Sequence, residues 1–180
     1  VYLCAADADG MMVSYIQSNF TGFGSGIVVP GTGIALQNRG FGFTLDEGHS
    51  NVIAPGKRPF HTIIPAFLTQ DGKGVGPFGV MGGHMQPQGH FQLAVNQIDY
   101  GLNPQAAVDA PRWEWIQGQV VEVETTVDPA IIAGLTARGH EVKVVPILTG
   151  GPKGQIIRRL ANGSYIAGSE PRSDGLAAGW

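Results

Sequence analysis

The sequence predicts an α+β fold in which largely antiparallel strand hairpins are covered by outer helices. Runs rich in β-branched and aromatic residues are joined by the turn dipeptides Asp9-Gly10, Asp71-Gly72 and Asn162-Gly163, which favour tight hairpins. Apolar residues recur at helical spacing in one segment. Two further helix starts combine a capping residue with proline, at Asn103-Pro104 and Asp128-Pro129. Hairpins and capped helices in one chain of 180 residues indicate a single domain over residues 1–180.

The elements can be placed in order along the chain. Residues 1–6 and 11–18 form the first predicted hairpin, and 66–70 with 74–80 form the second. Between them, 19–26 is expected to be a loop, and 27–30 and 33–36 are candidate short strands. Residues 38–59 are polar and glycine-rich and are expected to form a long loop, of a length that is typical of functional or site-covering segments. The remaining predicted elements are a helix over 84–100 with Phe91, Val95, Ile98 and Leu102 as its apolar row, a short helix over 105–109, strands over 113–116 and 119–124, a helix from Asp128 to Gly139, and strands over 141–145, 155–160 and 164–168.

Composition excludes several classes of function. The net charge is −3 and no cluster of Lys and Arg occurs, which argues against nucleic acid as a partner; Arg158-Arg159 is expected on a solvated strand edge. No apolar run is long enough to span a membrane. Cys4 is the only cysteine and is expected to be a buried structural thiol. Only 14% of residues are charged, well below the usual quarter, so a partner subunit is expected to cover part of the surface.

The segment from Gly79 to His90 contains the strongest candidate site. A strand ends there, Gly82-Gly83 forms a turn, and a helix begins. A helix start offers unpaired N–H groups and the positive end of the helix dipole to a negative oxygen. Glycine has no Cβ, so a substrate can approach its backbone closely. Glycine pairs are also common in plain turns, so the spacing alone favours a plain turn over a functional site.

Other constellations are incomplete. His84 and His90 are six residues apart, too far for the i, i+4 pair of zinc helices, so no metal site and no cofactor is expected. No Ser–His–Asp triad can be assigned from spacing. The carboxylates of Glu122 and Glu124 lie on one face of a predicted strand and are expected to face solvent rather than to form a glycosidase pair. The residues alone therefore yield an anion site without a nucleophile.

Nine segments in order resemble the small, C-terminal subunit of the γ-glutamyltranspeptidase family, including its divergent cephalosporin acylase-like members. They are Asp9-Gly10, Phe23-Gly24-Ser25-Gly26-Ile27, Gly31-Thr32-Gly33-Ile34, Lys57-Arg58-Pro59, Met81-Gly82-Gly83, Ile98-Asp99-Tyr100-Gly101-Leu102-Asn103, Ala110-Pro111-Arg112, Gly139-His140 and Glu170-Pro171-Arg172-Ser173.

The resemblance implies an N-terminal nucleophile hydrolase fold, in which two stacked antiparallel sheets lie between helix layers in an αββα sandwich. It also implies a large N-terminal subunit, cleaved from the same precursor, as the partner of this chain, with a dimer of heterodimers as the candidate assembly. A small γ-glutamyl-like or other acyl-amide substrate is expected, and neither cofactor nor metal. Because a targeting signal would lie on the large subunit, the compartment is left open.

The resemblance implies catalytic roles for three residues of this chain and for one residue that precedes it. Gly82 and Gly83 match the oxyanion-hole glycines, and Ser18 matches the hydroxyl residue that supports the nucleophile. The nucleophile itself, an N-terminal threonine whose α-amino group is the base, is expected immediately before Val1. The start of this sequence within a predicted strand fits a processed or cut chain.

Substrate contacts also carry over by resemblance. His61 and Thr62 occupy the place of paired serines that hold the γ-glutamyl carboxylate, so one hydroxyl is kept. Phe20 replaces a substrate-binding asparagine, for which the adjacent Asn19 is a candidate substitute.

Two further departures affect the substrate head group. Arg39 stands where the family has a polar residue, often Gln, and Gly42 stands where an acidic residue pairs with the substrate amino group. Arginine favours a carboxylate, so the sequence predicts an amide hydrolase or acyl transferase whose specificity is altered from γ-glutamyl. The alternatives are a non-catalytic protein that binds a small anion or peptide, and a nucleotide-binding domain, against which the antiparallel hairpins argue.

Overall fold

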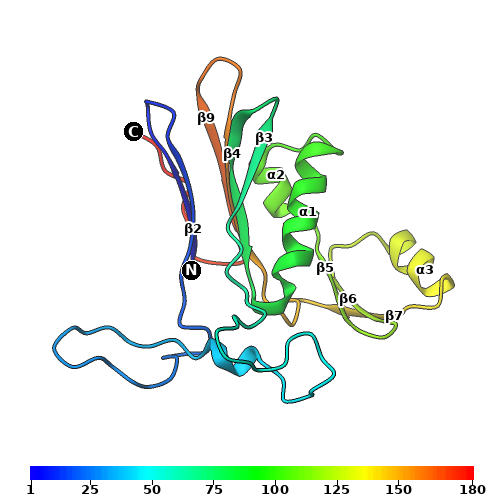
Figure 1. Cartoon of the computed structure of the whole chain (residues 1–180). Helices are drawn as coiled ribbons and strands as arrows, with labels where there is room; N and C mark the ends of the chain where they lie inside the picture. Colours follow the sequence, from blue (N-terminus) through cyan, green and yellow to red (C-terminus); the bar gives the residue numbers. More distant parts are fainter. The chain divides into compact units, whose positions relative to one another are not determined.

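The computed structural model describes all 180 residues (Figure 1). The chain divides into two compact units. One unit contains residues 17–63 together with Val1, and the other contains residues 2–16 and 64–180. The single-domain interpretation stays a prediction.

The second unit holds all nine strands, in three sheets, and three α-helices. A hairpin pairs β1 with β2, a four-stranded antiparallel sheet has the order β3-β4-β8-β9, and a three-stranded sheet has the order β5-β6-β7. The elements are β1 (Tyr2–Ala6), β2 (Met12–Ile16), β3 (Ala66–Gln70), β4 (Lys73–Met81), α1 (Gln86–Ile98), α2 (Pro104–Asp109), β5 (Trp113–Gln117), β6 (Val120–Glu124), α3 (Pro129–Ala137), β7 (Glu141–Val145), β8 (Lys153–Arg159) and β9 (Tyr165–Ser169).

Most of these elements lie within a few residues of their predicted positions, and one placement within a sheet is wrong. Arg158 and Arg159 belong to β8, which lies between β4 and β9 and is not an edge strand. Nη1 of Arg158 instead donates to the carbonyl oxygen of Leu102 at 3.3 Å. None of the helices is long and apolar enough to cross a membrane.

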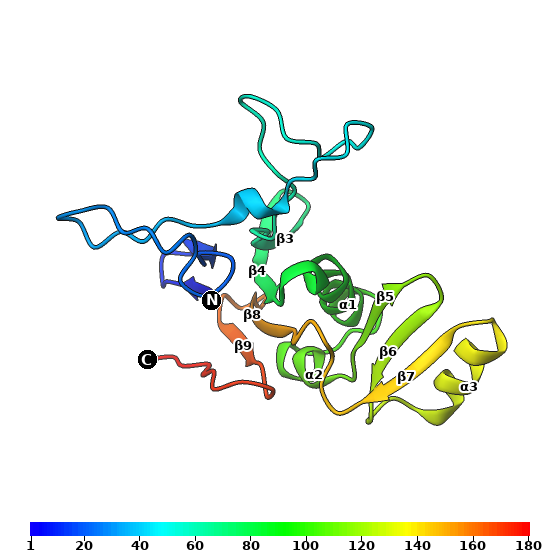
Figure 2. The same cartoon turned by 90° about the horizontal axis from the view of Figure 1, so that it is seen from below.

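The four-stranded sheet is the middle of three layers. The β1–β2 hairpin covers one face, and α1 and α2 cover the other (Figures 1 and 2). On the hairpin side the ring of Tyr2 lies against Gly79, where an added Cβ would stand 2.6 Å from the ring. On the helix side Val80, Leu93 and Ile156 are almost fully buried, each contributing roughly 1.5–3 kcal/mol of hydrophobic stabilisation.

The hairpin itself also carries Cys4. Its side chain is half-buried rather than fully buried as expected. Burial raises the pKa of the Cys4 thiol to about 11, so the thiol is protonated and a weak nucleophile at neutral pH.

Helix α1 has the predicted position but not the expected orientation. Two residues of its apolar row face solvent, with Phe91 61% and Ile98 63% exposed, whereas Leu102 packs against the core. The inner face carries Leu93 together with glutamines. Gln88 donates to and accepts from the main chain of Trp115, and Gln92 does the same with Trp113. Four residues along a helix span about 6 Å and two along a strand about 6.6 Å, so the two side-chain amides match the spacing of β5.

The three-stranded sheet contains the one parallel pair among the nine strands. Strand β6 pairs with β7 in parallel, joined by α3 in a β-α-β unit. Val121, Val123 and Val127 form its buried core against Ile132 and Leu135.

The first unit has little regular structure, as the glycine-rich composition predicts. It contains one short 3-10 helix, η1 (Arg39–Gly42), and two isolated bridges, Val28↔Ala35 and Thr44↔Val52. The predicted strands over 27–30 and 33–36 are therefore reduced to a single bridge. Turns with glycine at positive φ connect these short contacts.

Candidate functional site

The turn at Gly82-Gly83 has the geometry of a helix start. Strand β4 ends at Met81, and a 3-10 turn, η2 (Gly83–Met85), leads into α1. Gly82 has φ 146° and Gly83 φ 56°, values that side chains other than glycine rarely adopt. The carbonyl oxygen of Gly82 accepts from the N–H of Met85 at 3.1 Å. The first N–H groups of a helix have no acceptor within it, so this turn can present donors to an anion.

His90 fixes the helix to the strand behind this turn. Its Nε2 accepts from the N–H of Val80 at 3.3 Å, and its Nδ1 lies 2.7 Å from the carbonyl oxygen of Gln86. Because Nε2 accepts, Nδ1 carries the proton, and burial lowers the pKa of His90. Neutral His90 is thus a structural hydrogen-bonding residue. No group of three or more His, Cys, Asp or Glu side chains could hold a metal ion.

In the first unit, Arg39 connects two other predicted site residues. Its Nη1 donates to Oγ1 of Thr62 at 3.1 Å, and its Nη2 donates to Oγ of Ser18 at 2.5 Å and to the Ser18 carbonyl oxygen at 3.2 Å. The ring of Phe20 lies 5.6 Å from the guanidinium carbon, within cation–π range. Partial burial lowers the pKa of Arg39, but arginine starts so high that it stays charged.

The main chain beside Ser18 pairs with the first residue of the sequence. The N–H of Gln17 donates to the carbonyl oxygen of Val1 at 2.9 Å, and the nitrogen of Val1 donates to the carbonyl oxygen of Gln17 at 2.7 Å. This double exchange is the hydrogen-bonded pair of an antiparallel ladder. Continued by one step, the ladder places a residue that precedes Val1 opposite Ser18.

The other two predicted contact residues do not join the Arg39 cluster. His61 is exposed, and its Nδ1 accepts from the N–H of Ile63 at 3.1 Å. The carbonyl oxygen of Asn19 accepts from the N–H of Asn38. Thr62, by contrast, is only 6% exposed. The structure therefore brings together Ser18, Arg39 and Thr62.

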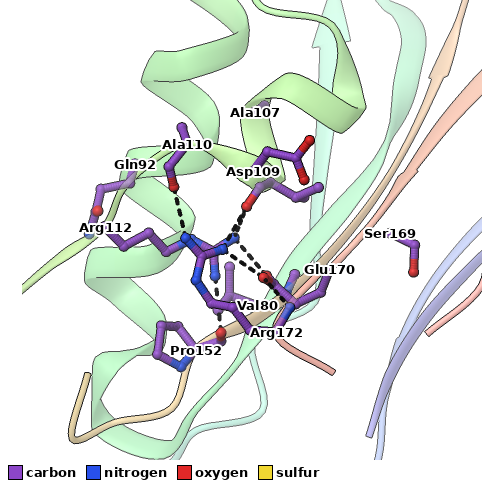
Figure 3. Close-up of polar contacts among 12 residues, drawn as sticks. Val80, Gln92, Ala107, Asp109, Ala110, Arg112, Pro152, Ser169, Glu170 and Arg172 are labelled. Carbon is purple, nitrogen blue, oxygen red and sulfur yellow. Dashed lines mark hydrogen bonds and ion pairs between the residues drawn. The ribbon is translucent and has the colours of Figure 1, made fainter. Parts of the chain in front are cut away.

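In the second unit, Arg112 and Arg172, to which the sequence assigns no role, form a buried ion cluster with Glu170 (Figure 3). Arg112, 1% exposed, lies 2.7 Å from Oε2 of Glu170 and donates to the carbonyl oxygens of Pro152 and Val108. Arg172 donates to the other oxygen of Glu170, also at 2.7 Å. Burial lowers the pKa of Arg112, and the Glu170 carboxylate opposes that effect.

The same cluster overturns the expectation for the acid pair on β6. Glu124 is 4% exposed. It accepts from Nε and Nη2 of Arg172, both at 2.6 Å, and from the N–H of Arg112 at 2.9 Å. A partner 48 residues along the chain thus allows this carboxylate to be buried. The pattern of the strand could not reveal that partner.

The second unit also contains a cavity that lies away from the predicted site residues. This cavity of about 510 Å³ is lined from β3, β4, β8 and the end of α1, by residues that include Val75, Gln97 and Arg158. None of the predicted site residues lines it.

Comparison with known proteins decides the family. The model of the γ-glutamyltranspeptidase family matches residues 1–180. The chain belongs to this family. Two curated members are each 40% identical to it over 187 residues: a glutathione hydrolase-like YwrD proenzyme of Bacillus subtilis and an oxamate amidohydrolase proenzyme of Klebsiella pneumoniae. The matches cover 99% and 100% of this chain and 35% of each proenzyme, so the chain spans about a third of these relatives.

The fold is confirmed by a solved member of the family. The crystal structure of cephalosporin acylase from Bacillus halodurans is 58% identical and superimposes with a TM-score of 0.92. The match covers 99% of this chain and 34% of the acylase chain. The α+β class and the N-terminal nucleophile hydrolase fold are therefore as predicted. The roles of the individual site residues stay predictions.

Proposed function

We propose that this chain is the small subunit of an amide-bond hydrolase or acyl transferase whose acyl donor ends in a carboxylate rather than in a full γ-glutamyl group. The observation that carries the proposal is the Arg39 cluster. Its guanidinium binds two hydroxyl groups, of Ser18 and Thr62, and no carboxylate of the protein. A charged arginine without a protein carboxylate is suited to bind an anionic substrate group.

The chemistry follows the family pattern. The hydroxyl of a threonine expected immediately before Val1 attacks the amide carbonyl, and its own α-amino group takes the proton. The carbonyl oxygen becomes an oxyanion, to which we assign the N–H groups of Gly82 and Gly83. The amine leaves with the proton and an ester remains on the threonine. Water or a second amine then attacks that ester and releases the acid or a new amide.

Ser18 has a supporting role in this scheme. The ladder between Val1 and Gln17 would bring the threonine opposite Ser18, whose hydroxyl already accepts from Arg39. One guanidinium would then orient Ser18 beside the nucleophile and hold the substrate carboxylate, with Thr62 as a further hydroxyl contact. Asn19 and His61 complete the proposed substrate contacts.

The substitutions at the head group support an altered specificity. Gly42 offers no acidic side chain for a substrate ammonium group, and a charged group left unpaired in a closed site is strongly disfavoured. Glutathione and oxamate, for which two relatives are named, are both amides that carry a carboxylate. The 58% identical protein is named a cephalosporin acylase, and a cephalosporin is a larger amide than oxamate.

The proposed partner is a large subunit from the same precursor. The relatives are proenzymes about three times as long as this chain, and exposed apolar side chains such as Phe91 and Ile98 fit a surface that another subunit covers. A dimer of heterodimers is the proposed assembly. No cofactor is needed for the reaction.

The test compares acyl donors on the purified heterodimer. Glutaryl-p-nitroanilide has the carboxylate but lacks the α-amino group of γ-glutamyl-p-nitroanilide. We expect kcat/KM to be at least about tenfold higher for the glutaryl compound, because a missing charge partner costs at least that much. Oxamate hydrolysis, followed by ammonia release, tests the smallest donor.

A variant of Arg39 tests whether this residue causes the preference for the glutaryl donor. Arg39→Gln restores the residue type frequent in the family and should reduce the glutaryl preference. An enzyme that hydrolyses γ-glutamyl-p-nitroanilide as fast as an ordinary transpeptidase and ignores the glutaryl compound would contradict the specificity. Absence of hydrolysis of all three donors would contradict the enzymatic function itself.

A further inference from the structure

The loop between β7 and β8, residues 146–152, packs against the main chain of Gly82. Strands β4 and β8 are antiparallel and Met81 is paired with Lys153, so the residue after Met81 meets the residue before Lys153. A Cβ added to Gly82 would stand 2.8 Å from the carbonyl oxygen of Gly150 and 3.2 Å from Cα of Pro152. The loop therefore sets how far the main chain of Gly82 can move in this direction.

Two carboxylates on neighbouring strands hold this loop. Glu114 on β5 and Glu122 on β6 are paired in the sheet register. Oε2 of Glu114 accepts from the N–H of Gly150 at 2.8 Å. Glu122 accepts from the N–H and the hydroxyl of Thr149, at 2.9 and 3.0 Å. Three hydrogen bonds to charged acceptors thus fix two successive loop residues.

The loop is held from its other sides as well. Leu148 is 2% exposed, and its carbonyl oxygen accepts from the N–H of Gly151. Gly150 is wedged between Met85 and Glu114: an added Cβ would stand 2.5 Å from Cβ of Met85 and 2.8 Å from a Glu114 oxygen. Met85 is the last residue of η2, two residues after Gly83. Gly150 therefore lies between the Glu114 carboxylate and Met85, next to the Gly82-Gly83 turn.

We propose that Glu114, together with Glu122, is a positioning residue that fixes the Gly82-Gly83 turn through the loop at Thr149 and Gly150. The inference rests on the proposed function only in that it assigns the oxyanion to this turn. Glu114 touches no reacting atom. It acts through Gly150, which touches both Gly82 and Met85.

The environment of Glu114 favours positioning over a contribution to stability. The residue is 7% exposed, and carboxylates directly opposite each other on neighbouring strands destabilise a sheet. Burial raises the pKa of Glu114, the hydrogen bond from Gly150 opposes this, and the charge of Glu122 raises it further. A buried carboxylate beside a second carboxylate destabilises the folded state. Its hydrogen bond to Gly150, in contrast, fixes the position of the loop.

The first test separates positioning from packing by kinetics of the heterodimer. In Glu114→Ala we expect kcat to fall about 10–100-fold with KM within about twofold, because a displaced oxyanion donor affects the transition state and not the ground state. Glu114→Gln keeps an oxygen that accepts from Gly150 and should stay within about threefold of wild type. Glu141→Ala removes an exposed carboxylate of the same sheet and should leave both parameters unchanged.

Three kinetic results would overturn the inference: equal kcat in Glu114→Ala and Glu141→Ala, a Glu114→Gln variant as impaired as Glu114→Ala, or a rise in KM at unchanged kcat. If Glu114→Ala does not fold, Thr149→Val provides the same comparison. It removes one hydrogen bond of an exposed residue and should lower kcat about two- to fivefold.

Amide hydrogen exchange keeps this inference separate from the proposed function. In Glu114→Ala, exchange should accelerate in the peptides that contain residues 148–152 and 82–86, and in Glu141→Ala it should not. Accelerated exchange in a protein that hydrolyses no donor would uphold the role of Glu114 and reject the proposed function. Unchanged exchange in an active enzyme would reject the role of Glu114 and leave the proposed function intact.

Discussion

Arginines in the two units are used in opposite ways. Arg112 and Arg172 of the second unit are surrounded by carboxylates and main-chain carbonyl oxygens. Arg39 of the first unit contacts two hydroxyl groups, one carbonyl oxygen and an aromatic ring. The first two charges are neutralised by the protein itself. The third remains uncompensated by any carboxylate of the chain.

The difference separates a structural charge from one that can act on a substrate. Breaking a buried, paired cluster leaves an uncompensated charge in the interior, so stability is lost. Removing Arg39 leaves two hydroxyl groups that can bind water, so stability changes little and substrate binding is lost. Activity and stability should therefore respond to different arginines.

The largest effect is expected for Glu170→Ala. This change leaves Arg112, 1% exposed, without its ion partner and removes the acceptor of the Gly154 N–H. We expect the free energy of unfolding to fall by about 3–5 kcal/mol, measured by chemical denaturation of the heterodimer. A loss below about 1 kcal/mol would contradict the structural role of the cluster.

Arg39→Ala should have the next largest effect, and on activity alone. We expect kcat/KM for a glutaryl donor to fall about 10–100-fold, which corresponds to about 1.4–2.7 kcal/mol. The free energy of unfolding should change by less than about 1 kcal/mol. Arg39→Lys, which keeps the charge but loses the planar fork, should be intermediate. A variant that unfolds as readily as Glu170→Ala would remove the contrast between the two units.

Glu114→Gln should have a smaller, pH-dependent effect on stability. Burial and the charge of Glu122 raise the pKa of Glu114, so the folded state binds the proton more tightly than the unfolded state. The wild type should therefore lose stability relative to Glu114→Gln as the pH rises from the usual glutamate pKa through the raised one. Melting temperatures at pH 4 and pH 7 measure this: the variant should be the more stable at pH 7 and equal at pH 4.

The smallest effect is expected at the surface pair Glu141–Lys143. The two side chains are 65% and 54% exposed, with 3.7 Å between Oε1 and Nζ. Glu141→Gln should change the free energy of unfolding by at most about 0.5 kcal/mol, because solvent and salt screen such pairs. A larger change would show that the presence of a charge, rather than its burial, determines how much stability a variant loses.

The sequence predicts the elements whose signals are local. The capping residues Asn103 and Asp128 accept from the N–H groups of Ala106 and Ala130, as their positions before a proline indicate. The hairpin turns also lie where their Asp-Gly and Asn-Gly dipeptides predict. These features depend on a few adjacent residues, which can be compared directly with known preferences.

Features that depend on distant partners were not predictable. The burial of Glu124 depends on Arg172, and the central position of β8 depends on which strands pair. Periodicity locates α1, but it cannot show that Leu93 and several glutamines occupy the inner face while Phe91 lies outside. The same holds for the candidate site. Ser18 and Thr62 are 21 and 23 residues from Arg39, so only the family resemblance, and not spacing, selected these residues together.

The glutamines of α1 also have a consequence for self-association. The side chains of Gln88 and Gln92 occupy main-chain hydrogen-bonding groups of Trp113 and Trp115, at the border of the three-stranded sheet where β5 has only β6 as a strand neighbour. Unoccupied groups at such a border are a template for strand addition by another chain. Two amide side chains thus block strand addition at the β5 border, without the need for a further strand.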